Sequence, residues 1–227
     1  MIKQTIAALL FVSTTPLLAQ YQPEAVGEFV QHTHYSLDYN EQHEQPNWVY
    51  YIFTPDMANG SSSRSNSFKA DPTVSSGSAT PSDYVKSGYD RGHLCPAGDM
   101  SFSSTAMKES FYMSNMSPQN PSFNRGIWRS CESYIRTLDC DTLYVVTGPI
   151  FRDNIGSIGK NSVTVPGAYY KVAYNPSTQK MWAFIIPNAK VSGELSDYRT
   201  SVDSVEIVTG IDLYYQLPDD LETELEK

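Results

Sequence analysis

The chain has 227 residues, a length that suits one globular domain, and 40% of them are apolar, as in ordinary folded proteins. Asp and Glu number 25 against 16 Lys and Arg, which gives a formal net charge of −9. Because phosphate binding favours a basic surface, this charge argues mildly against a nucleic-acid ligand. The acidic residues gather in residues 219–226, however, and a local basic patch elsewhere can still attract such a ligand.

The first twenty residues have the layout of a secretory signal. A positive charge at Lys3 precedes a short apolar run over residues 6–12, and Ala19 offers a small residue for cleavage. The run is shorter than the about 20 residues that a membrane-spanning helix needs, and no later segment qualifies. We therefore expect residues 1–20 to be a signal peptide and residues 21–227 to be a single exported domain, periplasmic or secreted.

The three cysteines are Cys95, Cys131 and Cys140. Export would place them in an oxidising compartment, where disulfides persist, and three cysteines can form at most one internal bridge. Cys131 and Cys140 are the closest pair in sequence. Two alternatives follow: a disulfide between these two residues, or three free thiols. Cys95 is expected to be unpaired in both, and no CxxC spacing indicates zinc.

The first half of the chain predicts few regular elements. Residues 21–47 are polar and mixed, residues 48–53 are aromatic and β-branched and predict a strand, and residues 59–67 predict a loop. A helix near residues 104–109 and a strand over residues 110–115 follow.

Asn120 and Pro121 then mark the start of a longer helix. Asn is a preferred N-cap and Pro suits the first helical position, so a helix is expected from this point to about Leu138.

The second half predicts a series of strands and then a helix. The strands cover residues 143–147, 162–165, 169–174 and 181–186, the first of them broken by Gly148-Pro149, and the helix covers residues 201–210. Strands and helices do not alternate strictly. This favours an α+β fold, with a mostly antiparallel central sheet flanked by helices, over a doubly wound parallel sheet.

Residues 90–93, Asp90-Arg91-Gly92-His93, are the first group with chemical potential. They place an acid, a base, a flexible residue and an imidazole within four positions. Histidine is the side chain best matched to proton transfer near neutral pH. The same four letters also suit a salt-bridged surface turn, so the motif is weak by itself.

The second group lies on the helix that Asn120 starts. Asn124, Trp128, Glu132 and Arg136 recur every four residues, so neighbouring members share one broad helical face. The amide oxygen of Asn124 is a hard neutral ligand that suits magnesium, and the helix N-terminus favours phosphate. The alternative is a solvated face with a Glu132–Arg136 pair.

Together these groups resemble the DNA/RNA non-specific endonuclease family, whose members carry a ββα-metal, or His-Me, finger. The likeness rests on three segments, residues 89–94, 115–119 and 124–132. It extends upstream to residues 64–72 and downstream to residues 144–149 and 186–188. The resemblance implies the α+β fold with a ββα-metal finger as its active site.

The resemblance also implies roles for individual residues. His93 matches the general base of the family. Asn124 matches its single protein ligand to a magnesium or manganese ion, whose other positions are filled by water. Glu132 matches a carboxylate that holds metal-bound water.

Four further positions are implied to assist. Arg136 matches an arginine that contacts phosphate, and Arg64 matches one that stabilises the transition state, although its spacing to the following motif varies in the family. Asp90 and Arg91 have supporting roles. Cys95 stands where other members often have an apolar or small residue.

The implied function is that of an exported, magnesium-dependent endonuclease that hydrolyses DNA and RNA. Its contacts would go to phosphate and metal rather than to base edges, so little sequence would be read. A metal-dependent phosphodiesterase for small substrates and a non-catalytic surface-binding protein on the same fold stay open. A zinc enzyme built on His32, His34 and His43 lacks an HExxH frame. The sequence leaves open the oligomeric state and the preference for DNA or RNA.

Overall fold

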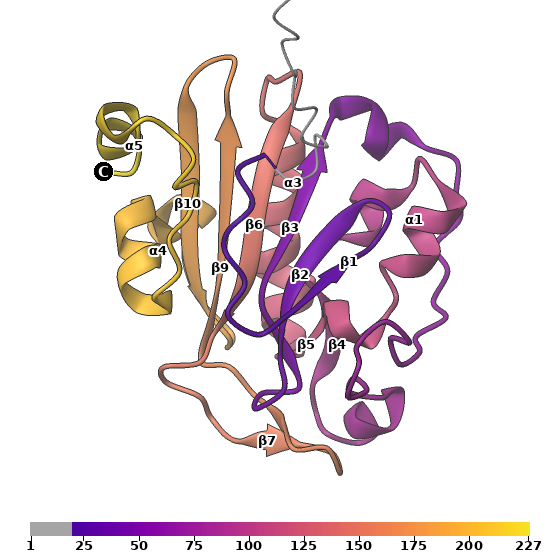
Figure 1. The fold of residues 1–227 in the computed structure, drawn as a ribbon. Helices are drawn as coiled ribbons and strands as arrows, with labels where there is room; N and C mark the ends of the chain where they lie inside the picture. Colours follow the sequence, from indigo (N-terminus) through magenta and orange to yellow (C-terminus); the bar gives the residue numbers. More distant parts are fainter. Residues whose placement is uncertain (1–19) are drawn as a thin grey trace, which may run out of the picture.

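The computed structural model describes residues 20–227, so nearly all of the expected signal peptide lies outside the described residues. Within this range one antiparallel sheet runs through the molecule (Figure 1). In spatial order it consists of β1 (Glu28–Gln31), β2 (Tyr35–Asn40), β3 (Gln45–Phe53), β6 (Leu143–Ile150), β9 (Ala168–Asn175), β10 (Lys180–Pro187) and β11 (Arg199–Thr200). The predicted α+β class with a mostly antiparallel sheet is confirmed.

Both faces of this sheet are buried, because its central strands are apolar on both sides. In β3, Trp48 and Tyr50 pack into one core, whereas Val49 and Tyr51 pack into the other. Alternation of this kind follows from the two-residue period of a strand. Helix α4 (Val202–Thr209) covers the first face and α3 (Arg129–Arg136) covers the second (Figure 1).

A smaller unit lies on the side of the sheet that α3 covers. Strand β4 (Asp90–His93) pairs antiparallel with β5 (Met116–Gln119), and α1 (Ser104–Glu109) lies between them in the chain. Gly92 is required here, since a Cβ atom would come within 2.0 Å of the Gln119 side chain. Helix α2 (Pro121–Phe123) follows β5 directly. The motif at residues 90–93 is therefore a strand, placed beside the start of the helix.

The helix that was expected from Asn120 to Leu138 begins as predicted but is interrupted. The Asn120 side chain accepts a hydrogen bond from the backbone of Ser122 at 2.9 Å, and Pro121 follows it. Residues Asn124–Trp128 then wind as a π-helix, with Gly126 outside helical geometry, before α3 resumes. A π-helical turn shifts the phase of the residues after it. The sequence had suggested that residues spaced by four share one broad helical face. Because of the π-helical turn, that face is not continuous from Asn124 to Arg136.

Two local expectations were wrong for identifiable reasons. Residues 110–115 are not a strand, because Asn115 holds the chain in a turn: its amide donates to the carbonyls of Cys95 and Ser110, each at 2.9 Å. Strand β6 also continues through Pro149, where a break was expected. Its pairing with β3 ends at Thr147, so the missing N–H of Pro149 falls where only β9 is paired.

The remaining elements cover the ends of the sheet. Strands β1 and β2 arise from the polar segment in which no strand was predicted, and β7 (Ser157–Ile158) pairs with β8 (Val163–Thr164) as a separate ribbon. The acidic tail forms α5 (Asp219–Leu225), beside α4 (Figure 1). None of the helices in residues 20–227 has the length and apolar character needed to cross a membrane.

Candidate active site

A cavity of about 220 Å³ lies where the end of β4 meets the interrupted helix. Its charged and polar lining consists of Arg64, Arg91, His93, Asn124, Arg125, Arg129 and Glu132. Five of the seven residues that the sequence singled out are thus brought together, although they are spread over nearly seventy positions. Four arginines around one cavity make a local basic patch in an acidic chain.

His93 lies at the end of β4, where it is almost fully buried. Its ring packs against Phe111 and Phe68, with ring centroids 4.7 Å and 5.8 Å away. Burial, and then the charge of Arg64, lower the pKa of His93 to about 3, so the imidazole is neutral near pH 7. Its Nε2 atom has no hydrogen-bond partner within residues 20–227. A neutral, unpartnered ring nitrogen is able to accept a proton.

Asn124, at the start of the π-helical segment, is held in one orientation by Asp90. Its Nδ2 donates to Asp90 Oδ2 at 2.9 Å, and Asp90 also accepts from Arg125 Nε at 2.8 Å. Burial alone would raise the pKa of Asp90, but these hydrogen bonds lower it and keep the carboxylate charged. With its nitrogen engaged, Asn124 has its amide oxygen left for another partner, as a hard oxygen donor to a cation.

The rings of Phe68 and Phe111 contact two of the cavity arginines as well as His93. The guanidinium of Arg91 lies 4.3 Å from the centre of the Phe68 ring, and that of Arg64 lies 5.0 Å from the Phe111 ring. These are the same rings that enclose His93. Such cation–π contacts orient a guanidinium while its N–H groups remain able to bind an anion.

Glu132 is a half-buried carboxylate in the lining of the cavity. Burial raises its pKa to about 7, and the charges of Lys171 and Arg136 oppose this shift. Lys171 is fully buried in β9, with its Nζ 4.9 Å from the Trp128 ring. The sequence interpretation missed Lys171. The signal was present, since it is the one charged residue in the apolar and aromatic segment 168–175.

Arg136 is placed differently from the expectation. It pairs with the buried carboxylate of Asp99 and lies 3.9 Å from Glu132 Oε2, and it is not part of the cavity lining. Arg125 and Arg129 line the cavity instead, and the sequence interpretation passed over both. Their position beside Asn124 and Trp128 in a chain with few basic residues was the available signal.

The three histidines of the zinc alternative form no group of possible ligands within residues 20–227. His32 bonds to Asp71 at 2.9 Å, whereas His43 bonds to Thr164 at 2.9 Å and stacks on Phe151. Within the described part of the chain, a group of three possible acidic, histidine or cysteine ligands occurs only at Asp203, Glu206 and Glu226. Those residues belong to the side of the sheet that α4 covers. The zinc alternative therefore has no structural basis in residues 20–227.

All three cysteines are free thiols, so the bridge between Cys131 and Cys140 is not formed. Cys131 points from α3 into the core, whereas Cys140 lies beyond the end of that helix and is partly exposed. Cys95 is fully buried in the same core, which makes it a small packing residue.

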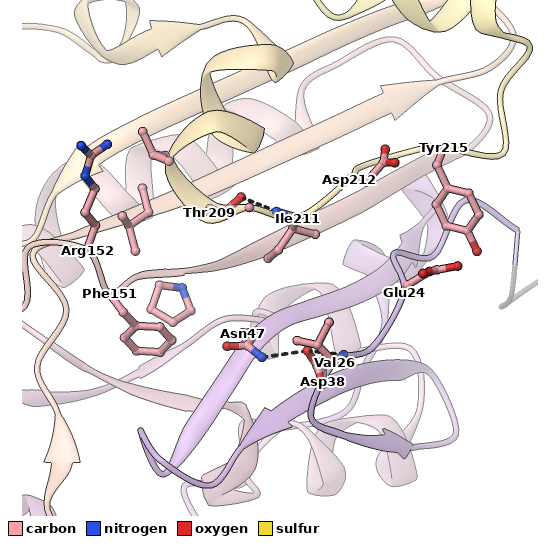
Figure 2. A pocket seen from close by; sticks show the side chains of 14 residues that line it. Glu24, Val26, Asp38, Asn47, Phe151, Arg152, Thr209, Ile211, Asp212 and Tyr215 are labelled. Carbon is pink, nitrogen blue, oxygen red and sulfur yellow. Dashed lines mark hydrogen bonds between the residues drawn. The ribbon is translucent and has the colours of Figure 1, made fainter.

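A larger cavity of about 470 Å³ lies elsewhere and carries none of the seven candidate residues (Figure 2). Its wall includes Phe151, Arg152 and Tyr215. The buried Asp38 carboxylate in this wall already accepts hydrogen bonds from Asn47 Nδ2 at 2.8 Å and from the Gly27 backbone at 2.7 Å. The chemistry therefore favours the smaller cavity as the active site.

The comparisons with known proteins identify the family of the chain. A family model described as DNA/RNA non-specific endonuclease matches residues 14–220. The chain is 34% identical to the mitochondrial nuclease EXOG of Mus musculus, over 86% of this chain and 59% of that protein. It is 34% identical to nuclease C1 of Cunninghamella echinulata, over 86% of both chains. It is 36% identical to the mitochondrial nuclease of Saccharomyces cerevisiae, over 79% of this chain and 63% of that protein.

A solved structure has the same fold. It is described as a complex of EndoG with EndoGI, and it matches with a TM-score of 0.82 and 29% identity, over 88% of this chain and 91% of that one. The chain spans about three fifths of the length of the mitochondrial EXOG relatives, 59% for the mouse protein. The resemblance stated from the sequence is confirmed.

The predicted location is contradicted by the same relatives. Proteins from mouse, yeast and cattle are named as mitochondrial nucleases, which overturns the expectation of an exported protein, periplasmic or secreted. The expectation rested on a positive start and a short apolar run in residues that lie outside the described part of the chain. The packing and the site chemistry of residues 20–227 do not determine the compartment of the protein. The argument that export favours a disulfide loses its basis too.

Proposed function

Because this chain belongs to the DNA/RNA non-specific endonuclease family, we propose that it is an endonuclease that hydrolyses phosphodiester bonds of DNA and RNA with little sequence preference. Residues 21–227 would act as a single nuclease domain. One observation carries the proposal: a buried neutral His93 and an oriented Asn124 share a cavity with four arginines. Acid–base chemistry, a hard oxygen ligand and anion binding are the three requirements of phosphodiester hydrolysis.

His93 serves as the general base in this proposal. Its free ring nitrogen takes a proton from a water molecule, which attacks phosphorus in line with the departing oxygen. The aromatic rings of Phe68 and Phe111 fix the imidazole plane. Trp128 fixes the backbone, because its indole N–H donates to the His93 carbonyl at 3.4 Å.

The residues present fit a magnesium or manganese ion. Asn124 would hold it through the amide oxygen, since Asp90 engages the amide nitrogen. When bound, the ion supplies charge neutralisation at the phosphate and at the leaving oxygen. Glu132 would orient water around it, and the buried charge of Lys171 favours the ionised form of that carboxylate.

The arginines account for substrate binding without sequence reading. Arg64, Arg91 and Arg129 present guanidinium groups to one cavity and would bind phosphate oxygens, which are the same in every nucleotide. The expected contact of Arg136 with phosphate stays a prediction. In the structure its guanidinium is engaged by Asp99.

The deciding experiment uses the purified chain with circular plasmid DNA and with ribosomal RNA. We expect both to be cut internally when magnesium or manganese is added and neither to be cut in excess chelator. Bis(p-nitrophenyl) phosphate serves as a small substrate in parallel. Hydrolysis of this small diester with intact polymers would favour the small-substrate phosphodiesterase. No hydrolysis of any substrate by folded protein would favour the binding protein.

A further inference from the structure

Three carboxylates converge on the side of the sheet opposite the active site. Asp203 and Glu206 belong to α4, and Glu226 directly follows α5. One possible ligand oxygen from each lies within 4.8 Å of the other two. Sequence reasoning had treated the last of these residues as part of a charged tail. In the structure it lies against the helix that carries the other two.

The burial of the Glu226 carboxylate is not explained by the acidic composition of the tail. The residue is only 6% exposed, and its Oε1 has no hydrogen-bond partner within residues 20–227. A buried carboxylate oxygen normally has a donor, because leaving it without one is costly. No ion pair of the described residues involves Asp203, Glu206 or Glu226.

The backbone around the cluster is already fixed by hydrogen bonds. The N–H of Asp203 donates to the carbonyl of Glu226 at 3.1 Å, which joins the end of α5 to the start of α4. Glu206 Oε1 accepts from the N–H of Leu213 at 2.6 Å, and Leu213 is buried in the core under α4. The carboxylates are thus held together by the fold in spite of their mutual repulsion.

We propose that Asp203, Glu206 and Glu226 form a second divalent-cation site, which takes a calcium-type ion and fastens α5 onto α4. All three possible ligands are carboxylate oxygens, and hard cations prefer oxygen ligands to nitrogen or sulfur ligands. Calcium tolerates irregular carboxylate arrangements, and its opposite ligands stand about 5 Å apart, which accommodates the spread of these oxygens. The ion would supply the partner that Glu226 Oε1 lacks. The site is separate from the cavity of His93 and takes no part in hydrolysis.

The test must separate this ion from one at the active site. All proteins therefore carry Asn124→Ala, which removes the proposed catalytic ligand. The probe is calcium chloride, followed by isothermal titration calorimetry and by the melting temperature in calcium and in chelator. We expect the Asn124→Ala protein to bind one calcium ion and to melt several degrees higher in calcium, because a ligand of the folded state stabilises it.

Glu226→Gln is the decisive variant, since it keeps the shape of the side chain and removes one charge. It should lose calcium binding and the calcium-dependent rise in melting temperature, while its melting temperature in chelator stays equal or increases through reduced repulsion. Glu224→Gln, at an exposed position of α5, is the matched control and should retain both effects. Asp203→Asn provides a second test from the other helix. Calcium binding and calcium-dependent melting that are unchanged in Glu226→Gln and Asp203→Asn would overturn the proposal.

Discussion

The two sides of the central sheet carry opposite charge. Where β4 meets α3, the cavity of His93 is lined by four arginines and one carboxylate. On α4 and just after α5, three carboxylates meet with no basic partner among residues 20–227. The net charge of −9 is a total over the whole chain and describes neither of these unlike regions. An acidic total is therefore compatible with a substrate that is itself a polyanion, because attraction depends on the local field.

The largest expected effect concerns the ligand oxygen in the basic cavity. Asn124→Ala should reduce hydrolysis of plasmid DNA to background even at raised magnesium, because no other cavity residue replaces that amide oxygen. Supercoiled-plasmid nicking rates measured over a magnesium titration provide the check. A variant that regains activity at high magnesium would show that Asn124 is not the essential ligand.

The second effect concerns proton transfer in the same cavity. His93→Ala should lower turnover by about 10²- to 10⁴-fold, the usual contribution of general acid–base catalysis, with the fold retained. Steady-state kinetics and circular dichroism measure the two quantities together. Near-normal turnover by the folded variant would remove His93 from the mechanism.

A smaller effect tests the charge difference itself. Arg129→Ala should weaken DNA binding and reduce the slope of log affinity against log salt concentration by about 1, as expected for one lost phosphate contact. Arg152→Ala, in the wall of the larger cavity (Figure 2), should leave the slope unchanged. Fluorescence anisotropy in chelator measures binding without cleavage. Equal slopes for the two variants would mean that the basic cavity is not the binding surface.

The smallest effect concerns acid stability beside the β4–β5 unit. Burial alone would raise the pKa of Asp71, but hydrogen bonds from His32, Ser114 and Thr73 lower it from 3.8 to about 2. A lowered pKa stabilises the fold above about pH 4, and this contribution is lost as the pH falls towards 2. Urea unfolding of the wild-type chain should therefore show a loss on the order of 2 kcal/mol over this range that Asp71→Asn does not show. Parallel pH profiles for the two proteins would contradict this prediction.

Local patterns in the sequence predicted most of the fold. Runs of aromatic and β-branched residues identified β3, β9 and β10, and the Asn120-Pro121 pair identified the start of the helix, because these signals act within a few residues. The π-helical segment was not predicted, since it depends on tertiary packing around Trp128 and Asn124. Strands β1 and β2 were missed because they are rich in polar residues, whose hydrogen bonds go to partners on other segments, as in the bond from Asn47 in β3 to Asp38 in β2.

The sequence predicted which residues belong to the candidate site better than it predicted how they are arranged. His93, Asn124 and Glu132 do line one cavity, which a motif match can indicate. The pairing of Arg136 with Asp99 and the electrostatic influence of the buried Lys171 on Glu132 join residues that are far apart in sequence. No local pattern encodes such pairs, so they became visible only with the fold.

The bare ring nitrogen of His93 has a consequence for protein engineering. A buried polar atom without a partner among residues 20–227 lowers the stability of the resting enzyme. An apolar ring of similar size at this position would pack against Phe68 and Phe111 without that cost. Selection for heat resistance alone would therefore favour an apolar ring at this position, so the proposed role of His93 as a base would come at the expense of thermal stability.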